Sequence, residues 1–114
     1  MLVRARDVPE VAEPSNHVVM RALVRAADHG PDLSMTWVRL SGRHRALRTE
    51  RSTRVYYLLG GSGRFEVGDD PPFDADAGDV VVVPRGVRYA FEGEMTYLVV
   101  NGPAFHEGDD VYED

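Results

Sequence analysis

The hydrophobic residues of this chain fall in short runs that are separated by closely spaced turn residues. Residues 33–40 alternate with a period of two, which is typical of a β-strand. Runs of similar length lie at residues 18–24, 54–59, 64–67 and 95–100. No stretch has the periodicity of an amphipathic helix. The pattern therefore predicts an all-β sandwich or barrel.

The most prominent run is four consecutive valines at residues 80–83. Gly78 begins a turn before them, and Pro84 and Gly86 form a tight turn after them, because proline fixes φ and glycine permits positive φ. Four β-branched residues between turns predict a strand that is buried on both faces. A second strand is expected to begin near Tyr89.

Further glycines mark where the predicted strands end, and the two chain termini lie outside the predicted core. We expect Gly42 to end the strand at 33–40, and residues 60–63, Gly-Gly-Ser-Gly, to form a turn. Residues 1–17 predict an extended arm that could contribute a short edge strand, and residues 107–114 predict a solvated acidic tail. No linker or repeat divides residues 1–114, so a single domain is expected.

Composition limits the function classes. A formal net charge of −6 argues against binding to a nucleic-acid backbone. The absence of cysteine excludes disulfides, thiolate metal sites and cysteine nucleophiles. The N-terminal residues lack the apolar segment of a signal peptide, and no apolar run could span a bilayer. A cytoplasmic protein with no membrane partner is the resulting expectation.

Residues 42–61 have the spacing of the first motif of the cupin superfamily, G-x5-H-x-H-x3-E-x6-G. The glycine places are held by Gly42 and Gly61, while Arg48, Glu50 and Arg54 stand where the motif has its two histidines and its glutamate. The chain therefore resembles cupins in this block. The resemblance implies a small double-sheet jelly-roll barrel, also called a double-stranded β-helix.

Residues 78–93 extend the resemblance to the second cupin motif, G-x5-P-x-G-x2-H-x3-N. Gly78, Pro84 and Gly86 match it, while Tyr89 replaces the histidine and Gly93 replaces the asparagine. The two motifs and their flanking strands cover most of the chain after residue 18. Finding both in order makes the cupin fold the expected architecture.

The substitutions within these motifs change the expected chemistry. In metal-binding cupins the four positions held here by Arg48, Glu50, Arg54 and Tyr89 bind a divalent ion. Arginine stays protonated and cannot act as a ligand, and two guanidinium groups would repel a cation. We therefore expect no metal and no other cofactor, and we do not expect metal-dependent oxygenase activity.

The four histidines offer no alternative metal site. His17, His29 and His106 lie near a terminus or turns, and no two histidines have the short spacing of a ligand pair. His44 is the only one near the expected barrel mouth. It is a candidate pocket residue, and the alternative is a histidine in a surface loop.

The side chains that replace the metal ligands predict a binding pocket. Because strand residues alternate between faces, an inward Arg54 places Tyr56 on the same face, and Arg48 and Glu50 share a face in the same way. Tyr89 would approach from the second motif. One carboxylate can pair with only one of the two guanidinium groups, so one positive charge would remain uncompensated.

This surplus charge leads to the hypothesis that the barrel binds a small, anionic organic metabolite. His44 and Trp37 complete the candidate ligand-binding set, although Trp37 and Tyr56 could equally be core residues. The alternative is that Arg48, Glu50 and Arg54 form an ion-pair cluster that fills the barrel of a non-catalytic structural or regulatory protein.

An enzymatic function is a further alternative. Nearby arginines could lower the pKa of Tyr89, so that Tyr89 or Glu50 acts as acid or base in a metal-independent isomerisation or cyclisation. Some cupins catalyse reactions of these classes, so the resemblance permits this hypothesis.

One face of the strand at 54–59 suggests self-association. Val55, Tyr57 and Leu59 lie opposite Arg54 and are apolar or amphipathic. An apolar outer face needs a cover, which either the N-terminal arm or a second copy of the chain could provide. We expect a homodimer.

Overall fold

The computed structural model describes all 114 residues and consists mostly of β-strands. Eight strands form an antiparallel sheet: β1 Val11–Glu13, β2 Val18–Val24, β3 Ser34–Thr49, β4 Thr53–Val67, β5 Phe73–Asp76, β6 Val80–Val83, β7 Tyr89–Gly102 and β8 Asp110–Tyr112. The helical segments are short: α1 Ala26–His29 and the 3₁₀ turns η1 Ala5–Asp7 and η2 Pro14–Asn16. None of these could cross a membrane as a helix. The prediction of an all-β chain is confirmed.

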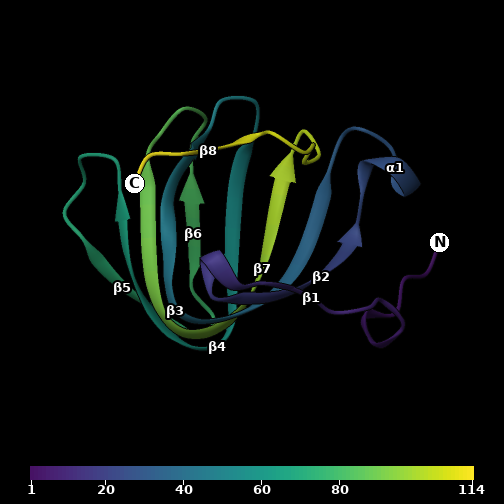
Figure 1. Cartoon of the computed structure of the whole chain (residues 1–114), viewed down its shortest axis with the longest axis horizontal. Coiled ribbons are helices and arrows are strands. Elements are labelled where there is room, and N and C mark those ends of the chain that lie inside the picture. The colour runs from purple at the N-terminus through teal and green to yellow at the C-terminus, as the bar shows by residue number, and fades with distance from the viewer.

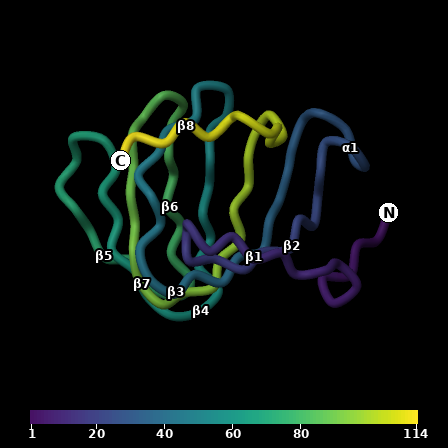
Figure 2. Tube along the Cα trace, viewed as in Figure 1, coloured from purple at the N-terminus to yellow at the C-terminus, as the bar shows by residue number.

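Three long strands, β3, β4 and β7, determine the architecture because each runs through both walls of a barrel. β7 lies between β3 and β4 and pairs with both along nearly its whole length. β2 and β8 pair with the first and last parts of β3, while β6 and β5 do the same for β4. Figures 1 and 2 show the long strands turning over at one end of the molecule, while β8 crosses the opposite end. The sheet therefore folds back on itself and encloses an interior.

Glycines allow the long strands to turn over. Gly93 on β7 is aligned with Gly42 on β3 and with Gly63 on β4. Gly42, Gly61 and Gly93 have φ angles of 126°, 74° and 150°, which residues with a side chain rarely adopt. The predictions that Gly42 ends a strand and that residues 60–63 form a turn are wrong. The glycines bend β3 and β4 without interrupting them.

The valine run forms β6, but only one of its faces is buried. Val81 and Val83 are buried in the core, whereas Val80 and Val82 have exposed fractions of 56% and 55%. The prediction of burial on both faces is therefore wrong. β6 belongs to the barrel wall, and alternation along a strand leaves every second valine outside.

Large aromatic side chains fill the interior near the bend. Phe91 stacks against Phe65 and Tyr89 with ring centroids 5.1 and 5.9 Å apart, and all three side chains are almost completely buried. Each such ring removes a large apolar area from water. The end of the barrel near the bend is therefore filled by packed side chains.

The N-terminal arm agrees with the expectation, whereas the C-terminal tail does not. The arm at residues 1–17 contains the expected edge strand, because β1 pairs with β2 at the border of the sheet. The solvated tail predicted for residues 107–114 is wrong. These residues contain β8, which pairs with the end of β3, and their carboxylates form ion pairs with arginines between residues 45 and 54.

Candidate functional site

A cavity of about 190 Å³ lies inside the barrel, between its two walls. We call it the barrel cavity. It includes three of the predicted ligand-binding residues, His44, Arg54 and Tyr56. The rest of its lining consists of Glu13, Val18, Met20, Thr36, Val38, Tyr97, Val99, Asn101, Phe105 and Asp110. The barrel is therefore not filled by its own side chains, contrary to the plugged-barrel alternative.

Arg54 lines this cavity and is the centre of a buried polar cluster that extends beyond it to Tyr89, which does not line the cavity. The Arg54 side chain is 6% exposed and reaches from the start of β4 to two partners. Nη1 donates a hydrogen bond of 3.0 Å to the Tyr89 hydroxyl, and Nη2 forms an ion pair with Asp110 on β8. The carboxylate neutralises the guanidinium group. The expected uncompensated positive charge is therefore wrong for Arg54.

Tyr56 and Tyr89 continue the cluster through their hydroxyl groups, whose oxygens lie 2.6 Å apart. Burial raises the pKa of Tyr89, although the positive charge of Arg54 acts in the opposite direction. Burial also raises the pKa of Tyr56. The predicted lowering of the Tyr89 pKa is therefore wrong, and both phenols keep their hydrogens at neutral pH.

His44 provides the one imidazole of the cavity. Its ring stacks on Phe91 with a centroid distance of 4.6 Å, and Nδ1 lies 2.9 Å from the carbonyl oxygen of Arg45. A carbonyl oxygen only accepts hydrogen bonds, so Nδ1 carries the hydrogen and Nε2 keeps a lone pair. Burial lowers the pKa of His44 from its usual value of 6.5. The ring is therefore neutral at pH 7.

Arg48 and Glu50 do not belong to the cavity lining. Arg48 pairs with Glu50 at 2.6 Å and also with Glu113, and the Glu50 side chain is 64% exposed. The cause is an irregularity in the β3–β7 register between His44 and Leu47. An extra residue in a strand inverts which side chains face inward beyond it. The motif spacing therefore identified the right segment but the wrong face.

Trp37 also lies outside the barrel cavity. Its neighbours along β3, Thr36 and Val38, line the cavity, so alternation places Trp37 on the outer face. There the guanidinium carbons of Arg21 and Arg39 lie 5.5 and 5.9 Å from the centre of its ring. Its prediction as a ligand-binding residue is therefore not supported by its position.

Five polar residues of the cavity were not found by sequence reasoning: Glu13, Thr36, Tyr97, Asn101 and Asp110. The alternation of β7 could have identified Tyr97 and Asn101, because both share its inward face with the core residue Met95. Glu13 and Asp110 come from the arm and the tail. No local pattern there indicates an inward position.

The donors present do not fit the divalent ion that metal-binding cupins hold. No group of three or more histidine, aspartate or glutamate side chains in the chain is arranged to bind a metal ion. Of the four motif positions, Arg54 carries a cationic side chain bonded to Tyr89, and Arg48 and Glu50 form an ion pair with each other. Such a site needs several free oxygen or nitrogen donors.

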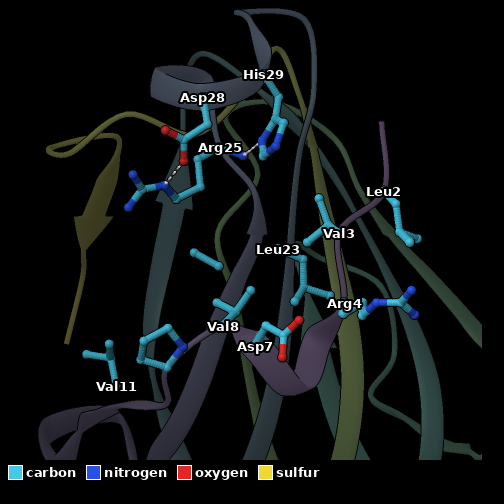
Figure 3. Close-up of a pocket in the computed structure, with 12 residues that line it drawn as sticks. Leu2, Val3, Arg4, Asp7, Val8, Val11, Leu23, Arg25, Asp28 and His29 are labelled. Carbon is cyan, nitrogen blue, oxygen red and sulfur yellow. Dashed lines mark hydrogen bonds and ion pairs between the residues drawn. The ribbon is translucent and has the colours of Figure 1, made fainter.

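A wider hollow of about 630 Å³ lies between the N-terminal arm, β2 and α1 (Figure 3). In it, Arg25 pairs with Asp28 at 2.8 Å, and the His29 ring accepts a hydrogen bond from the Arg25 backbone. None of the predicted ligand-binding residues lines this hollow. The barrel cavity is therefore the candidate site.

Comparison with known proteins gives structural matches only. No protein-family model and no curated protein matches the sequence. Among solved structures, Pac13, a nucleoside dehydratase, aligns with a TM-score of 0.85 and 20% identity over 99% of this chain and 90% of its own. Three variants of Streptomyces Pac13, one substituted at a histidine and two at a tyrosine, were solved with uridine and align equally well.

Two further structural neighbours are proteins other than Pac13. KdgF from Halomonas sp. aligns with a TM-score of 0.81 and 15% identity over 94% of this chain and 96% of its own. Oxalate decarboxylase from Bacillus subtilis aligns with a TM-score of 0.80 and 20% identity, over 95% of this chain but only 30% of its own. At these identities the likeness establishes the fold.

Proposed function

We propose that this chain, which has the cupin fold, binds a neutral polar small molecule in its barrel cavity and removes water from it, with His44 as the general base. The observation that carries the proposal is the fixed tautomer of His44. Its Nδ1 is held by the Arg45 carbonyl, which leaves a basic Nε2 on a residue of the cavity lining.

The charges of the cavity favour a neutral ligand over an anion. Asp110 and Glu13 contribute two negative charges and Arg54 one positive charge, while His44 is neutral because burial lowers its pKa. The formal net charge of the cavity lining is therefore −1. An anion would have to displace Asp110 from Arg54, which costs more than binding to an unpaired cation. The anionic ligand inferred from the sequence becomes the less favoured alternative.

The phenol cluster supplies a hydrogen-bond donor in addition to the base. Arg54 can only donate, so the oxygen of Tyr89 accepts from it. Tyr89 can then donate its own hydrogen to Tyr56, which leaves the hydrogen of Tyr56 available to the ligand. Tyr56 is thus the candidate acid, and Tyr89 is a positioning residue that touches no part of the cavity itself.

Water elimination requires this combination of groups. A base removes a proton from carbon, and an acid donates a proton to the departing hydroxyl group. The likeness to Pac13 supports this class, because that protein is a nucleoside dehydratase and the variants solved with uridine change a histidine or a tyrosine. Nucleosides are neutral and polar, in agreement with the charge of the cavity.

Replacement of His44 by glutamine tests the proposed base. We expect water loss to slow by about 10²-fold, the usual contribution of one general base. The substrates to screen are nucleosides and sugars with a carbonyl group beside the C–H bond, because a neutral imidazole removes only an acidified proton. Mass spectrometry follows the loss of one water. His106→Gln, at an exposed histidine, is the matched control.

The pH profile gives an independent check. Because burial lowers the pKa of His44 from its usual 6.5, the acid-side decline of kcat/KM should have its midpoint below pH 6.5. The decline reflects protonation of Nε2. A midpoint above pH 6.5, or equal activity of His44→Gln and the wild type, would remove His44 from the mechanism.

We also propose that the outer face of β4 and β6 forms a homodimer contact. Tyr57 and Leu59 on β4 are 43% and 46% exposed, and Val80 and Val82 on β6 are exposed beside them. The N-terminal arm pairs with β2 and does not cover this face. Of the two possible covers, the N-terminal arm and a second copy of the chain, only the second copy remains.

A charge within this patch should separate the two copies. We expect Val82→Glu to convert a dimer into a monomer, measured by light scattering after gel filtration at micromolar concentration. Val11→Glu is the control, because Val11 is equally exposed, at 59%, but lies on β1 at the other border of the sheet. A wild-type protein that elutes as a monomer would refute the contact.

A further inference from the structure

Three alternate residues of β7, Tyr97, Val99 and Asn101, line the barrel cavity. Alternate residues of a strand lie on the same face, about 6.7 Å apart. Tyr97 and Asn101 therefore mark two levels of the cavity, roughly 13 Å apart along the strand. Val99 lies between them and offers only apolar contact. The strand thus presents two polar groups separated by an apolar one.

The inner level, at Tyr97, carries a hydroxyl group with no hydrogen-bond partner elsewhere in the chain. The Tyr97 side chain is 2% exposed, and its ring packs edge-on against Tyr56 and Phe91 with centroid distances of 5.2 and 6.0 Å. Burial raises the pKa of Tyr97, so the hydroxyl keeps its hydrogen. Tyr97 is therefore a neutral, uncommitted donor in the cavity wall.

The outer level, at Asn101, carries two polar atoms without hydrogen-bond partners, one on each of two neighbouring strands. Asn101 is 5% exposed, and its Oδ1 has no hydrogen-bond partner. Arg54 is aligned with Asn101 across β4 and β7, and its Nε–H also has no partner. Buried polar atoms are nearly always paired in folded proteins. An acceptor and a donor left open at the same level suit one ligand group that both donates and accepts.

We propose that Tyr97 and Asn101 select the ligand by its two polar ends, an inference that rests on the proposed function of the cavity. The ligand is then an elongated neutral molecule with an apolar or planar middle part beside Val99. Its inner end accepts a hydrogen bond from Tyr97. Its outer end is a hydroxyl or amide that donates to Asn101 Oδ1 and accepts from Arg54 Nε. A pyrimidine nucleoside, with carbonyl groups on the base and hydroxyl groups on the sugar, belongs to this class.

Uridine is the probe for this two-point recognition. We expect Tyr97→Phe and Asn101→Leu each to raise the Kd of uridine about tenfold in titration calorimetry, the effect of one lost hydrogen bond. Tyr57→Phe is the matched control, because it removes a hydroxyl group from the outer face of the same sheet. Its Kd should equal that of the wild type.

Thermal unfolding without ligand separates this inference from a structural role. An unpaired buried polar atom stabilises nothing in the free protein, so the Tm of Tyr97→Phe and Asn101→Leu should equal or exceed that of the wild type. A Tm several degrees lower would show that these groups have partners within the protein and would overturn the inference.

The outcomes of the two measurements are distinguishable. If uridine binds the wild type and both variants equally, the inference fails while the proposed binding function stands. If uridine does not bind the wild type, the nucleoside ligand of the proposed function fails. In that case the Tm comparison still decides whether Tyr97 and Asn101 are free for another ligand: an unchanged or higher value supports the inference, and a lower one refutes it.

Discussion

Replacement of Gly61 by alanine is expected to destabilise the protein by about 4 kcal/mol or more, a large part of the stability of a domain of this size. A Cβ atom at this position would lie 2.0 Å from the carbonyl oxygen of Glu94 and 2.9 Å from the Cα atom of Met95. Both atoms belong to the backbone of β7, so relief requires the β4–β7 pairing to open. The φ angle of 74° adds strain for any residue with a side chain.

Gly60→Ala is the matched control for this prediction. A Cβ atom on Gly60 would meet nothing within 4 Å, and its φ angle is not positive. We expect a change in the free energy of unfolding within about 0.5 kcal/mol, measured by urea denaturation. Similar unfolding midpoints for the two variants would mean that the sheet turns over without a glycine requirement at position 61.

The same glycines show what sequence reasoning could and could not provide. The spacing from Gly42 to Gly61 and from Gly78 to Gly93 carried the resemblance to cupins, and the fold confirms it. Local rules, however, treat glycine as the end of a strand. Only the pairing of β7 with both β3 and β4 reveals that Gly42 and Gly61 bend strands that continue.

The candidate site was predicted in part for a similar reason. Alternation from Arg54 correctly placed Tyr56 in the barrel cavity, because β4 is regular over that stretch. The same rule failed for Arg48, because the irregularity after His44 inverts the faces of β3. Register irregularities depend on how neighbouring strands pair, and the sequence of one strand does not contain that information.

The C-terminal tail was beyond local reasoning altogether. A run of acidic residues is usually a solvated segment, and nothing within residues 107–114 indicates a strand. Its order comes from arginines more than fifty positions earlier in the chain: Arg51 binds Asp109 with two hydrogen bonds of 2.9 Å, and Arg45 pairs with Asp114 at 3.0 Å. Both partners were visible in the sequence, but their proximity follows from the closed barrel.

Replacement of Asp110 by alanine is expected to destabilise the protein by about 3 kcal/mol, at the lower end of the range for breaking a buried ion pair. The Arg54 side chain is 6% exposed and the Asp110 side chain 25% exposed, so solvent compensates the remaining charge only in part. The corresponding fall in Tm is about 10 °C. Urea denaturation at neutral pH measures the free energy. Asp28→Ala is the control, because its pair with Arg25 is about half exposed on both sides and contributes at most about 0.5 kcal/mol.

A second substitution identifies the source of the loss. If the uncompensated charge of Arg54 causes it, Arg54→Met in the Asp110→Ala background should recover part of the stability, because the double variant buries no unpaired ion. If the lost packing of β8 causes it, the second substitution should destabilise further, since Arg54 also donates to Tyr89. Equal stability of Asp110→Ala and Asp28→Ala would contradict a buried pair. Recovery would assign Asp110 the role of keeping a cationic side chain in the cavity for which we propose a neutral ligand.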